Sequence, residues 1–234
     1  MASRATGKTP VSWWKKLLSY LWLFTLERPA SELTPSLTVR LDNGRLVVDA
    51  ANVNYAYGEL DTFFRAAFKR LGIPELHMRD VLILGFGAGN VATILREQEQ
   101  DKTGPLAITG VEKDLVMPAL GRRYFGLDAL EPLTICIEDA TQFVQSAADN
   151  RYDLIVVDLF VEDVVPQRFA QKAFLRRLGK LLKPGGLLFF NRLMDTDMHQ
   201  KESEAFLKIM QHLLPGTTGR RVRSNLVCLY RKPR

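Results

Sequence analysis

Hydrophobic residues form five short continuous runs in the middle and C-terminal parts of the chain. These runs cover residues 80–84, 106–111, 133–137, 152–157 and 187–192. Their length and their content of Val, Ile and Leu are typical of strands that are buried on both faces of a sheet. Apolar residues with helical spacing separate the runs, and we expect helices over residues 90–99, 114–125, 140–148, 168–182 and 199–213.

This alternation of strand and helix predicts the fold class. Strands that are connected through helices pair in parallel, and the helices then cover both faces of the sheet. Strand-like runs at residues 219–223 and 225–231 predict an antiparallel pair that closes one edge. We therefore expect a Rossmann-like, doubly wound α/β domain with a mostly parallel, seven-stranded sheet.

A different pattern precedes this domain. Apolar and polar residues alternate over residues 36–49, and Asn43-Gly44 supplies the tight turn of a β-hairpin. An amphipathic helix is expected over residues 60–71, because the Gly-Ile-Pro sequence that follows would end it. The predicted parts are a tail with an N-terminal helix (residues 1–35), a β-hairpin extension (residues 36–58) and the α/β domain (residues 59–234).

Residues 12–26 are apolar and rich in aromatic side chains, and residues 1–10 before them are small and polar, for which we expect disorder. The pattern predicts a helix of about four turns, which is too short to span a bilayer. Three roles are open for this helix: packing on the domain, insertion into a membrane interface, or contact between subunits. We expect packing or self-association, for example in a homodimer, ahead of peripheral membrane association.

The composition limits the number of domains and the kinds of site that we expect. At 234 residues with 47% hydrophobic content, the chain is long enough for one sizeable core. Cys136 and Cys228 lie in apolar strand-like runs, which favours packed thiols in a reducing, cytoplasmic compartment over a disulfide. The three histidines have no ligand spacing with these cysteines, and we expect no metal site.

The formal net charge of +6 raises the question of nucleic acid binding. Much of the excess lies in the basic runs of residues 220–223 and 231–234, with more at residues 15–16 and 122–123. Dispersed basic residues are usually solvated, and the sequence has no recognition-helix or aromatic RNA-binding signature. Nucleic acid is therefore not a favoured partner.

Three alternating glycines follow the first strand of the α/β domain. Gly85, Gly87 and Gly89 give the spacing G-x-G-x-G, and Asn90 stands where a dinucleotide-binding loop has its third glycine. Gly85 would permit the sharp turn, while Gly87 and Gly89 would let the backbone approach a ligand at a helix N-terminus. The spacing favours an S-adenosyl ligand over NAD; a tight turn that only packs helix on strand would leave the same pattern.

Acidic residues follow the next three strands. Glu112 is placed to accept both hydroxyls of an adenosine ribose, and Asp139-Ala140 to meet the adenine amino group. Asp158 would face the reacting centre, because the carboxyl ends of parallel strands meet at one edge of a sheet. Each acid taken singly also fits a helix N-cap or a solvated loop charge.

The combination of these motifs resembles the class I S-adenosylmethionine-dependent methyltransferase superfamily, and within it the spermidine synthase-like family. The resemblance covers roughly residues 37–192 and includes the hairpin and the Pro-Gly-Gly before the fifth strand. Its more specific motifs are Tyr57-Gly58-Glu59, residues 111–116, Arg123-Tyr124-Phe125 and residues 152–158.

The resemblance implies a transferase that binds S-adenosylmethionine or its decarboxylated form and acts on a small acceptor, which could be an amine. Asp158 is the expected base or ligand for an acceptor amine. The expected cofactor-binding residues are Gly85, Phe86, Gly87, Ala88, Gly89, Glu112, Lys113, Asp139, Ala140, Asp158 and Leu159. The expected acceptor-binding residues are Tyr57, Glu59, Glu162 and Asp163.

Departures from the family motifs bear on the reaction. Aminopropyltransferases carry an aspartate in the glycine loop for the charged amine of their donor, and Ala88 stands there. Val161 replaces their second acid after the fourth strand, and Glu162 and Asp163 follow it. Because an ammonium group must lose a proton before it attacks, these changes favour methyl transfer over aminopropyl transfer.

Another position points the opposite way. Methyltransferases commonly have an acid two residues before the first glycine, and Ile83 stands there, as an apolar residue does in spermidine synthases. Ala88 and Val161 favour methyl transfer, and Ile83 favours aminopropyl transfer. We expect methyl transfer first and aminopropyl transfer second. A third hypothesis is a non-catalytic module that binds an adenosyl ligand and docks through Trp13 and Trp14.

Overall fold

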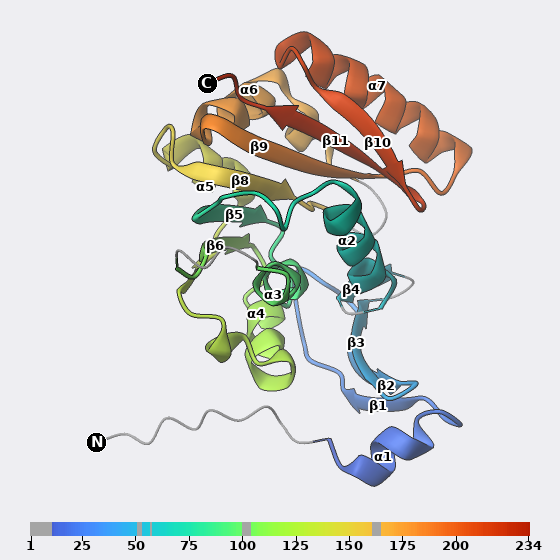
Figure 1. Ribbon diagram of the computed structural model, residues 1–234. Helices are drawn as coiled ribbons and strands as arrows, with labels where there is room; N and C mark the ends of the chain where they lie inside the picture. Colours follow the sequence, from blue (N-terminus) through green and yellow to red (C-terminus); the bar gives the residue numbers. More distant parts are fainter. Residues whose placement is uncertain (1–10, 51–52, 57, 100–103, 161–164) are drawn as a thin grey trace.

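The protein is described by a computed structural model, which covers residues 11–50, 53–56, 58–99, 104–160 and 165–234. It contains a seven-stranded and a four-stranded sheet (Figure 1). The helices are α1 (Trp13–Leu18), α2 (Glu59–Arg70), α3 (Asn90–Glu97), α4 (Val116–Leu120), α5 (Ala140–Ser146), α6 (Lys172–Leu181) and α7 (Asp197–Leu213). Shorter helical turns are η1 (Gly121–Phe125), η2 (Leu127–Ala129) and η3 (Gln167–Ala170).

The large sheet has its first strand in chain order, β5 (Asp80–Leu84), near its centre. On one side β6 (Ala107–Glu112) and β7 (Leu133–Ile137) follow, and on the other β8 (Tyr152–Val157) and β9 (Leu182–Leu193), all parallel. After β7 the chain thus crosses to the other side of β5, so that the strand order switches between β5 and β8. In open α/β sheets this switch point opens a crevice for ligands at the carboxyl ends of the strands.

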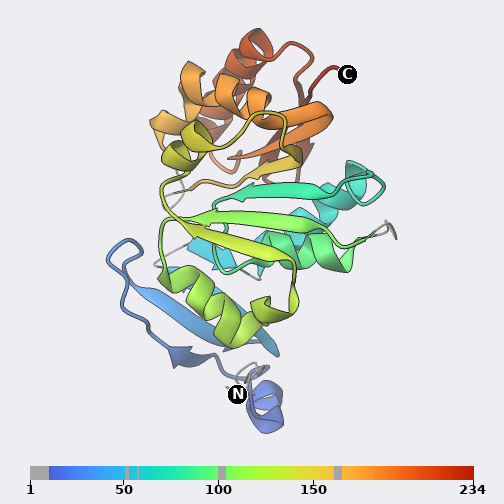
Figure 2. The same cartoon turned by 90° about the vertical axis from the view of Figure 1, so that its left-hand side faces the viewer.

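An antiparallel pair completes the sheet beyond β9. β11 (Asn225–Arg231) pairs with β9, and β10 (Thr218–Val222) forms the edge. The strand order β10-β11-β9-β8-β5-β6-β7 confirms the predicted seven-stranded, mostly parallel, doubly wound fold. Figure 2 shows the sheet with helices on both of its faces.

Two apolar layers lie on the two faces of this sheet because successive residues of a buried strand point to opposite sides. Val81 and Ile83 of β5 face the layer that contains α2 and α3, where Phe64 and Phe68 are fully buried. Leu82 and Leu84 face the layer of α5, α6 and α7. Each fully buried side chain of this size contributes about 1.5–3 kcal/mol to folding.

The small sheet contains the predicted hairpin. β2 (Leu37–Asp42) and β3 (Arg45–Ala50) pair antiparallel, and positive φ angles of 47° at Asn43 and 74° at Gly44 form the turn between them. Two further strands, β1 (Phe24–Glu27) and β4 (Val53–Ala56), extend it to the order β1-β2-β3-β4, which the sequence pattern did not predict. Leu37, Val39 and Val48 pack against α4 and the glycine loop.

The predicted helix over residues 12–26 was wrong in its extent. The helix α1 ends at Leu18, and Phe24–Glu27 forms strand β1, which pairs with the edge of β2. None of the residues of α1 is buried, and its apolar side chains are exposed. Backbone hydrogen bonds to β2 favour a strand at β1, and helical spacing of apolar residues cannot reveal such a non-local partner.

Two other boundaries also differ from the expectation. The strand β9 begins at Leu182 and runs through Pro184-Gly185-Gly186, where a turn was expected before a strand at 187–192. Gly186 packs so closely that a Cβ there would lie 3.0 Å from the carbonyl oxygen of Tyr152. The helix expected at 114–125 is divided into α4 and the π-helical turn η1.

Candidate functional site

The glycine loop connects β5 to α3 at the switch point of the sheet. Gly85, Gly87 and Gly89 have φ angles of 82°, 55° and 89°, a region that favours glycine. The backbone N–H groups of Gly85 and Phe86 donate to the carbonyl oxygen of Val111 at 3.1 and 3.0 Å. The loop is therefore held against the end of β6, next to the predicted ribose ligand.

Packing within the protein explains two of these glycines. A Cβ on Gly85 would lie 2.1 Å from the carbonyl oxygen of Asp158, and one on Gly89 would lie 2.2 Å from Cδ2 of Leu127. Gly89 therefore makes room for Leu127, and the approach of its backbone to a ligand stays a prediction. The close approach at Gly85 brings the loop directly beside the carboxyl end of β8.

Glu112 follows β6, and its carboxylate faces the glycine loop. Its Oε2 accepts a hydrogen bond of 2.8 Å from the backbone N–H of Gly87. Its Oε1 accepts from the backbone N–H groups of Lys113 at 2.8 Å and Asp114 at 2.9 Å. Desolvation raises the pKa of Glu112, and the three N–H donors act in the opposite direction. The carboxylate is thus fixed in position beside the loop.

Asp158 follows β8 and lies at the same edge of the sheet. Its Oδ1 accepts a hydrogen bond of 2.8 Å from Nδ2 of Asn191, whose own Oδ1 accepts from Nδ2 of Asn225 at 2.9 Å. Part of the Asp158 surface remains accessible, but protein atoms surround its carboxyl densely. This desolvation raises the pKa of Asp158 to about 6, while the bond from Asn191 lowers it.

Asp139 caps the helix α5. Its Oδ1 accepts from the backbone N–H of Thr141 at 2.8 Å, and its Oδ2 lies 3.3 Å from a guanidinium nitrogen of Arg168. The alternative of a helix N-cap is therefore realised at this position, and its contact with adenine stays a prediction. Ala140 is buried as the first residue of α5.

Ala88 and Asn90, at the end of the glycine loop, have different surroundings. Ala88 is fully buried in the cluster that Leu37 and Val48 of the small sheet complete. Asn90 is the first residue of α3 and only 3% exposed, and both polar atoms of its amide lack a hydrogen-bond partner within the described part of the chain. An unpartnered buried amide is costly, so Asn90 is a candidate to bind a polar group of a ligand.

The remaining predicted site residues are not all at the glycine loop or at the ends of the strands, and some lie outside the described residues. Phe86 is buried, with its ring against Gly110 on β6. Lys113 is exposed, and Leu159 packs on the layer of α5, α6 and α7. Glu59 begins α2. Tyr57, Glu162 and Asp163, together with Val161, lie outside the described residues.

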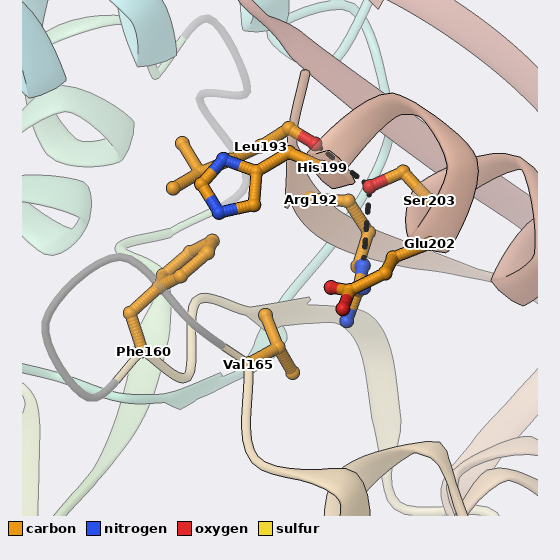
Figure 3. Close-up of a pocket in the computed structure, with 7 residues that line it drawn as sticks. All are labelled: Phe160, Val165, Arg192, Leu193, His199, Glu202 and Ser203. Carbon is orange, nitrogen blue, oxygen red and sulfur yellow. Dashed lines mark hydrogen bonds and ion pairs between the residues drawn. The ribbon is translucent and has the colours of Figure 1, made fainter. Parts of the chain in front are cut away.

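A small pocket lies between the C-terminal end of β9 and α7 (Figure 3). Its volume of about 10 Å³ is that of roughly one water molecule, so it is not the cofactor crevice. Arg192 is buried there, with Nε 3.4 Å from Oγ of Ser203 and a terminal nitrogen 3.9 Å from Oε2 of Glu202. Desolvation lowers the pKa of this guanidinium.

Residue patterns did not predict roles for Asn191 and Asn225, nor a ligand contact of Asn90. Asn191 lies near the carboxyl end of a parallel strand, and the rule that selected Asp158 could have selected it. The other two asparagines gave no such signal. Their burial and pairing depend on contacts with residues far away in the chain.

Residues 70–220 match the spermine/spermidine synthase domain, a span of more than half the chain that includes the glycine loop, Glu112 and Asp158. The chain belongs to the spermine/spermidine synthase domain family. This membership confirms the resemblance that the motifs indicated.

Relatives of this family member carry out two kinds of transfer. The chain is 25% identical over 148 residues to the polyamine aminopropyltransferase of Vibrio vulnificus (strain CMCP6), which is 61% of this chain and 48% of that protein. It is 25% identical over 144 residues to the eEF1A lysine and N-terminal methyltransferase of Homo sapiens, covering 56% of this chain and 20% of that protein. The chain thus spans about half or less of these relatives.

The fold match to solved structures is more extensive. A crystal structure of spermidine synthase in complex with the transition state analogue AdoDATO superposes with a TM-score of 0.70. It covers 89% of this chain and 73% of that chain, at 14% sequence identity. At this identity the superposition supports the fold of this family member and leaves its substrates open.

Proposed function

We propose that this member of the spermine/spermidine synthase domain family transfers the aminopropyl group of decarboxylated S-adenosylmethionine to an amine. Asp158 carries the proposal, because it presents a carboxyl group with a raised pKa beside the glycine loop. The family match and the aminopropyltransferase relative favour this reaction over methyl transfer, which the sequence motifs had placed first.

The loop residues fit an adenosyl donor. Glu112 has three of its roughly four acceptor positions occupied by backbone N–H groups, which leaves one on Oε2 for a ribose hydroxyl. Asn90 offers a donor and an acceptor that lack partners among the described residues. We infer that Glu112 holds the ribose and that Asn90 binds a polar group of the donor.

The bound donor would supply a sulfonium with an electrophilic carbon. The nitrogen of the acceptor amine forms a bond to the propyl carbon, the C–S bond breaks, and its electron pair stays on sulfur. The products are then an N-aminopropylated amine and 5′-methylthioadenosine. Such an in-line displacement requires mainly positioning of the two reactants and exclusion of water.

Asp158 would act on the proton of the acceptor. With a pKa of about 6, its carboxyl is mostly ionised at neutral pH, where it can attract a cationic amine and accept a proton from the attacking nitrogen. The bond from Asn191 leaves Oδ2 of Asp158 as the oxygen for this role. A methyl group transferred to an amine would require the same base.

Methyl transfer is the second candidate, and Ala88 favours it. The family aspartate that binds the amine of a decarboxylated donor is missing, and Ala88 is enclosed by apolar side chains of the small sheet. A carboxylate at this position would be buried without a cationic partner, which is costly. The amine of a donor would therefore need another ligand.

The nucleoside product distinguishes the two reactions. We would incubate the purified protein with short diamines and either donor, and analyse the products by mass spectrometry. Formation of 5′-methylthioadenosine from the decarboxylated donor supports aminopropyl transfer, and S-adenosylhomocysteine from S-adenosylmethionine supports methyl transfer. Asp158→Asn should abolish turnover, whereas Asp128→Asn, at an exposed site, should not. Donor binding without turnover of either donor would favour the non-catalytic module.

A further inference from the structure

A group of exposed apolar side chains lies at the N-terminal end of the described chain. We call it the aromatic patch. It consists of Trp13, Trp14, Leu17, Leu18, Tyr20, Leu21, Trp22 and Leu23. These side chains are between 36% and 76% exposed, and Trp13 at 76% and Leu21 at 72% are the most exposed. Single exposed apolar residues are common, but eight of them within eleven positions mark a binding surface.

The aromatic patch is attached to the folded domain at a defined place. The buried Ser19 accepts a hydrogen bond of 2.7 Å from the backbone N–H of Gly44 through Oγ, and its carbonyl oxygen accepts one of 3.1 Å from Asn43. The ring of Tyr20 lies against Gly44, where an added Cβ would come within 2.9 Å of its hydroxyl. The turn of the β2–β3 hairpin therefore holds the patch in position.

The patch lies far from the α/β core. In Figures 1 and 2, α1 and the small sheet form one end of the molecule, and α7 lies at the opposite end. Of the described helices, none is long and apolar enough to cross a membrane. The helix α1 has six residues and is only about 9 Å long, a length suited to lie on a surface.

The charged side chains of the segment that carries the patch are all basic. Residues 1–26 contain Arg4, Lys8, Lys15 and Lys16 and no acidic residue. Lys15 lies 5.5 Å from the centroid of the Trp14 ring, so its ammonium group is next to the aromatic surface. The first acidic residue, Glu27, is already paired with Arg123 and Tyr124. This end of the chain has an unneutralised positive charge.

We propose that the aromatic patch docks the protein on an anionic phospholipid bilayer. Tryptophan and tyrosine rings are enriched at the level of lipid headgroups, where Lys15 and Lys16 would bind phosphate groups. A second copy of the chain is a poorer occupant, since a two-fold interface would bring its lysine pair close to that of the first copy. The proposal is independent of the transfer reaction.

Intrinsic fluorescence offers a direct test, because all three tryptophans of the chain lie in the aromatic patch. We would titrate the full-length protein with phosphatidylcholine vesicles, with and without phosphatidylserine, and also measure co-sedimentation. We expect a blue shift of the emission and co-sedimentation with the phosphatidylserine vesicles only. We expect both effects to weaken at high salt, which screens the lysine charges.

Paired variants separate the two contributions to binding. Lys15→Gln/Lys16→Gln should weaken binding about 20- to 30-fold, on the basis of roughly 1 kcal/mol for each lysine. Lys201→Gln/Lys208→Gln removes the same charge from the exposed face of α7 and should leave binding unchanged. Trp13→Ala/Trp22→Ala should weaken binding about tenfold or more, while the exposed Met198→Ala/Ile209→Ala pair on α7 should not.

Three outcomes would overturn the proposal. The first is the absence of binding to phosphatidylserine vesicles by the folded protein. The second is binding that the two α7 pairs weaken as much as the patch variants do. The third is emission that is already blue-shifted without lipid in a dimer detected by analytical ultracentrifugation, which would assign the patch to self-association.

Discussion

The side-chain amide of Asn191 donates a 2.8 Å hydrogen bond to the carboxylate of Asp158, and it connects two neighbouring parallel strands at their carboxyl ends. Asn225 fixes the orientation of Asn191 from β11 through a bond of 2.9 Å. The amide bond stabilises the ionised form of Asp158, whereas desolvation favours the protonated form. Desolvation has the larger effect, and the pKa of Asp158 is raised to about 6.

Replacement of Asn191 should therefore shift the pH dependence of transfer. Asn191→Ala removes the donor that lowers the pKa of Asp158, so this pKa should rise further, by roughly half a unit to one unit. The acidic limb of the kcat/KM profile should move to higher pH by the same amount. Asn225→Ala removes only the group that orients Asn191, so it should give a smaller shift in the same direction. An unchanged pH profile in Asn191→Ala would contradict the role of Asn191.

The buried carboxylate should also lower stability above its pKa. The folded-state pKa of about 6 lies above the unfolded value near 3.9, so the folded state binds more protons between these values and stability falls as pH rises through them. Asp158→Asn keeps an oxygen for Asn191 and removes the charge. We expect it to raise the free energy of unfolding by about 1–3 kcal/mol at pH 8.

Denaturant unfolding of both proteins at pH 8 and pH 4 would measure this effect. The difference should nearly disappear at pH 4, where Asp158 is protonated in the folded state. The exposed Asp128→Asn should show a much smaller difference at both pH values. A gain in stability that is the same at pH 4 and pH 8 would show that charge is not its cause.

The close contact at Gly85 gives a prediction on stability. Gly85→Ala combines a φ of 82° with a Cβ 2.1 Å from the carbonyl oxygen of Asp158. Gly216→Ala has a similar φ of 92°, but no described atom lies within 4 Å of the added Cβ. The control should lose about 1–2 kcal/mol from the backbone conformation alone. Gly85→Ala should lose at least about 2 kcal/mol more, because backbone must move.

Urea denaturation would compare the two glycine variants under the same conditions. If their losses were equal, the loop would accommodate a side chain at Gly85 without moving β8. The packing of the loop on the backbone of Asp158 would then not be needed for stability.

Asn90 should show opposite effects on stability and on donor affinity. Its amide is buried without a partner among the described residues, so Asn90→Ala removes a desolvated polar group and should not lower the free energy of unfolding. Affinity for the adenosyl donor should fall about tenfold if the amide binds it. The control is Asn225→Ala, whose buried amide is hydrogen-bonded and whose loss should cost about 1 kcal/mol.

Thermal unfolding without ligand and calorimetric titration with either donor would measure the two properties. A destabilised Asn90→Ala protein with unchanged donor affinity would assign Asn90 to the scaffold. In that case the loop would contact the donor through its backbone alone.

Local residue patterns were sufficient to predict part of the fold. The buried strands of the parallel sheet, the Asn43-Gly44 turn and the glycine loop all follow from residue types at fixed spacings, because each pattern is favourable in only one backbone geometry. The acidic residues Glu112 and Asp158 were found for a related reason. Parallel strands in a doubly wound sheet bring their carboxyl ends to one edge.

The remaining features depend on partners that are distant in the chain. Phe24–Glu27 is a strand since it pairs with β2, and Gly89 is needed because Leu127 occupies the space beside it. Burial raises the pKa of Asp158, and it leaves the amide of Asn90 without a hydrogen-bond partner among the described residues. Burial depends on how the layers of the fold close around a side chain, and no spacing of residue types contains that information.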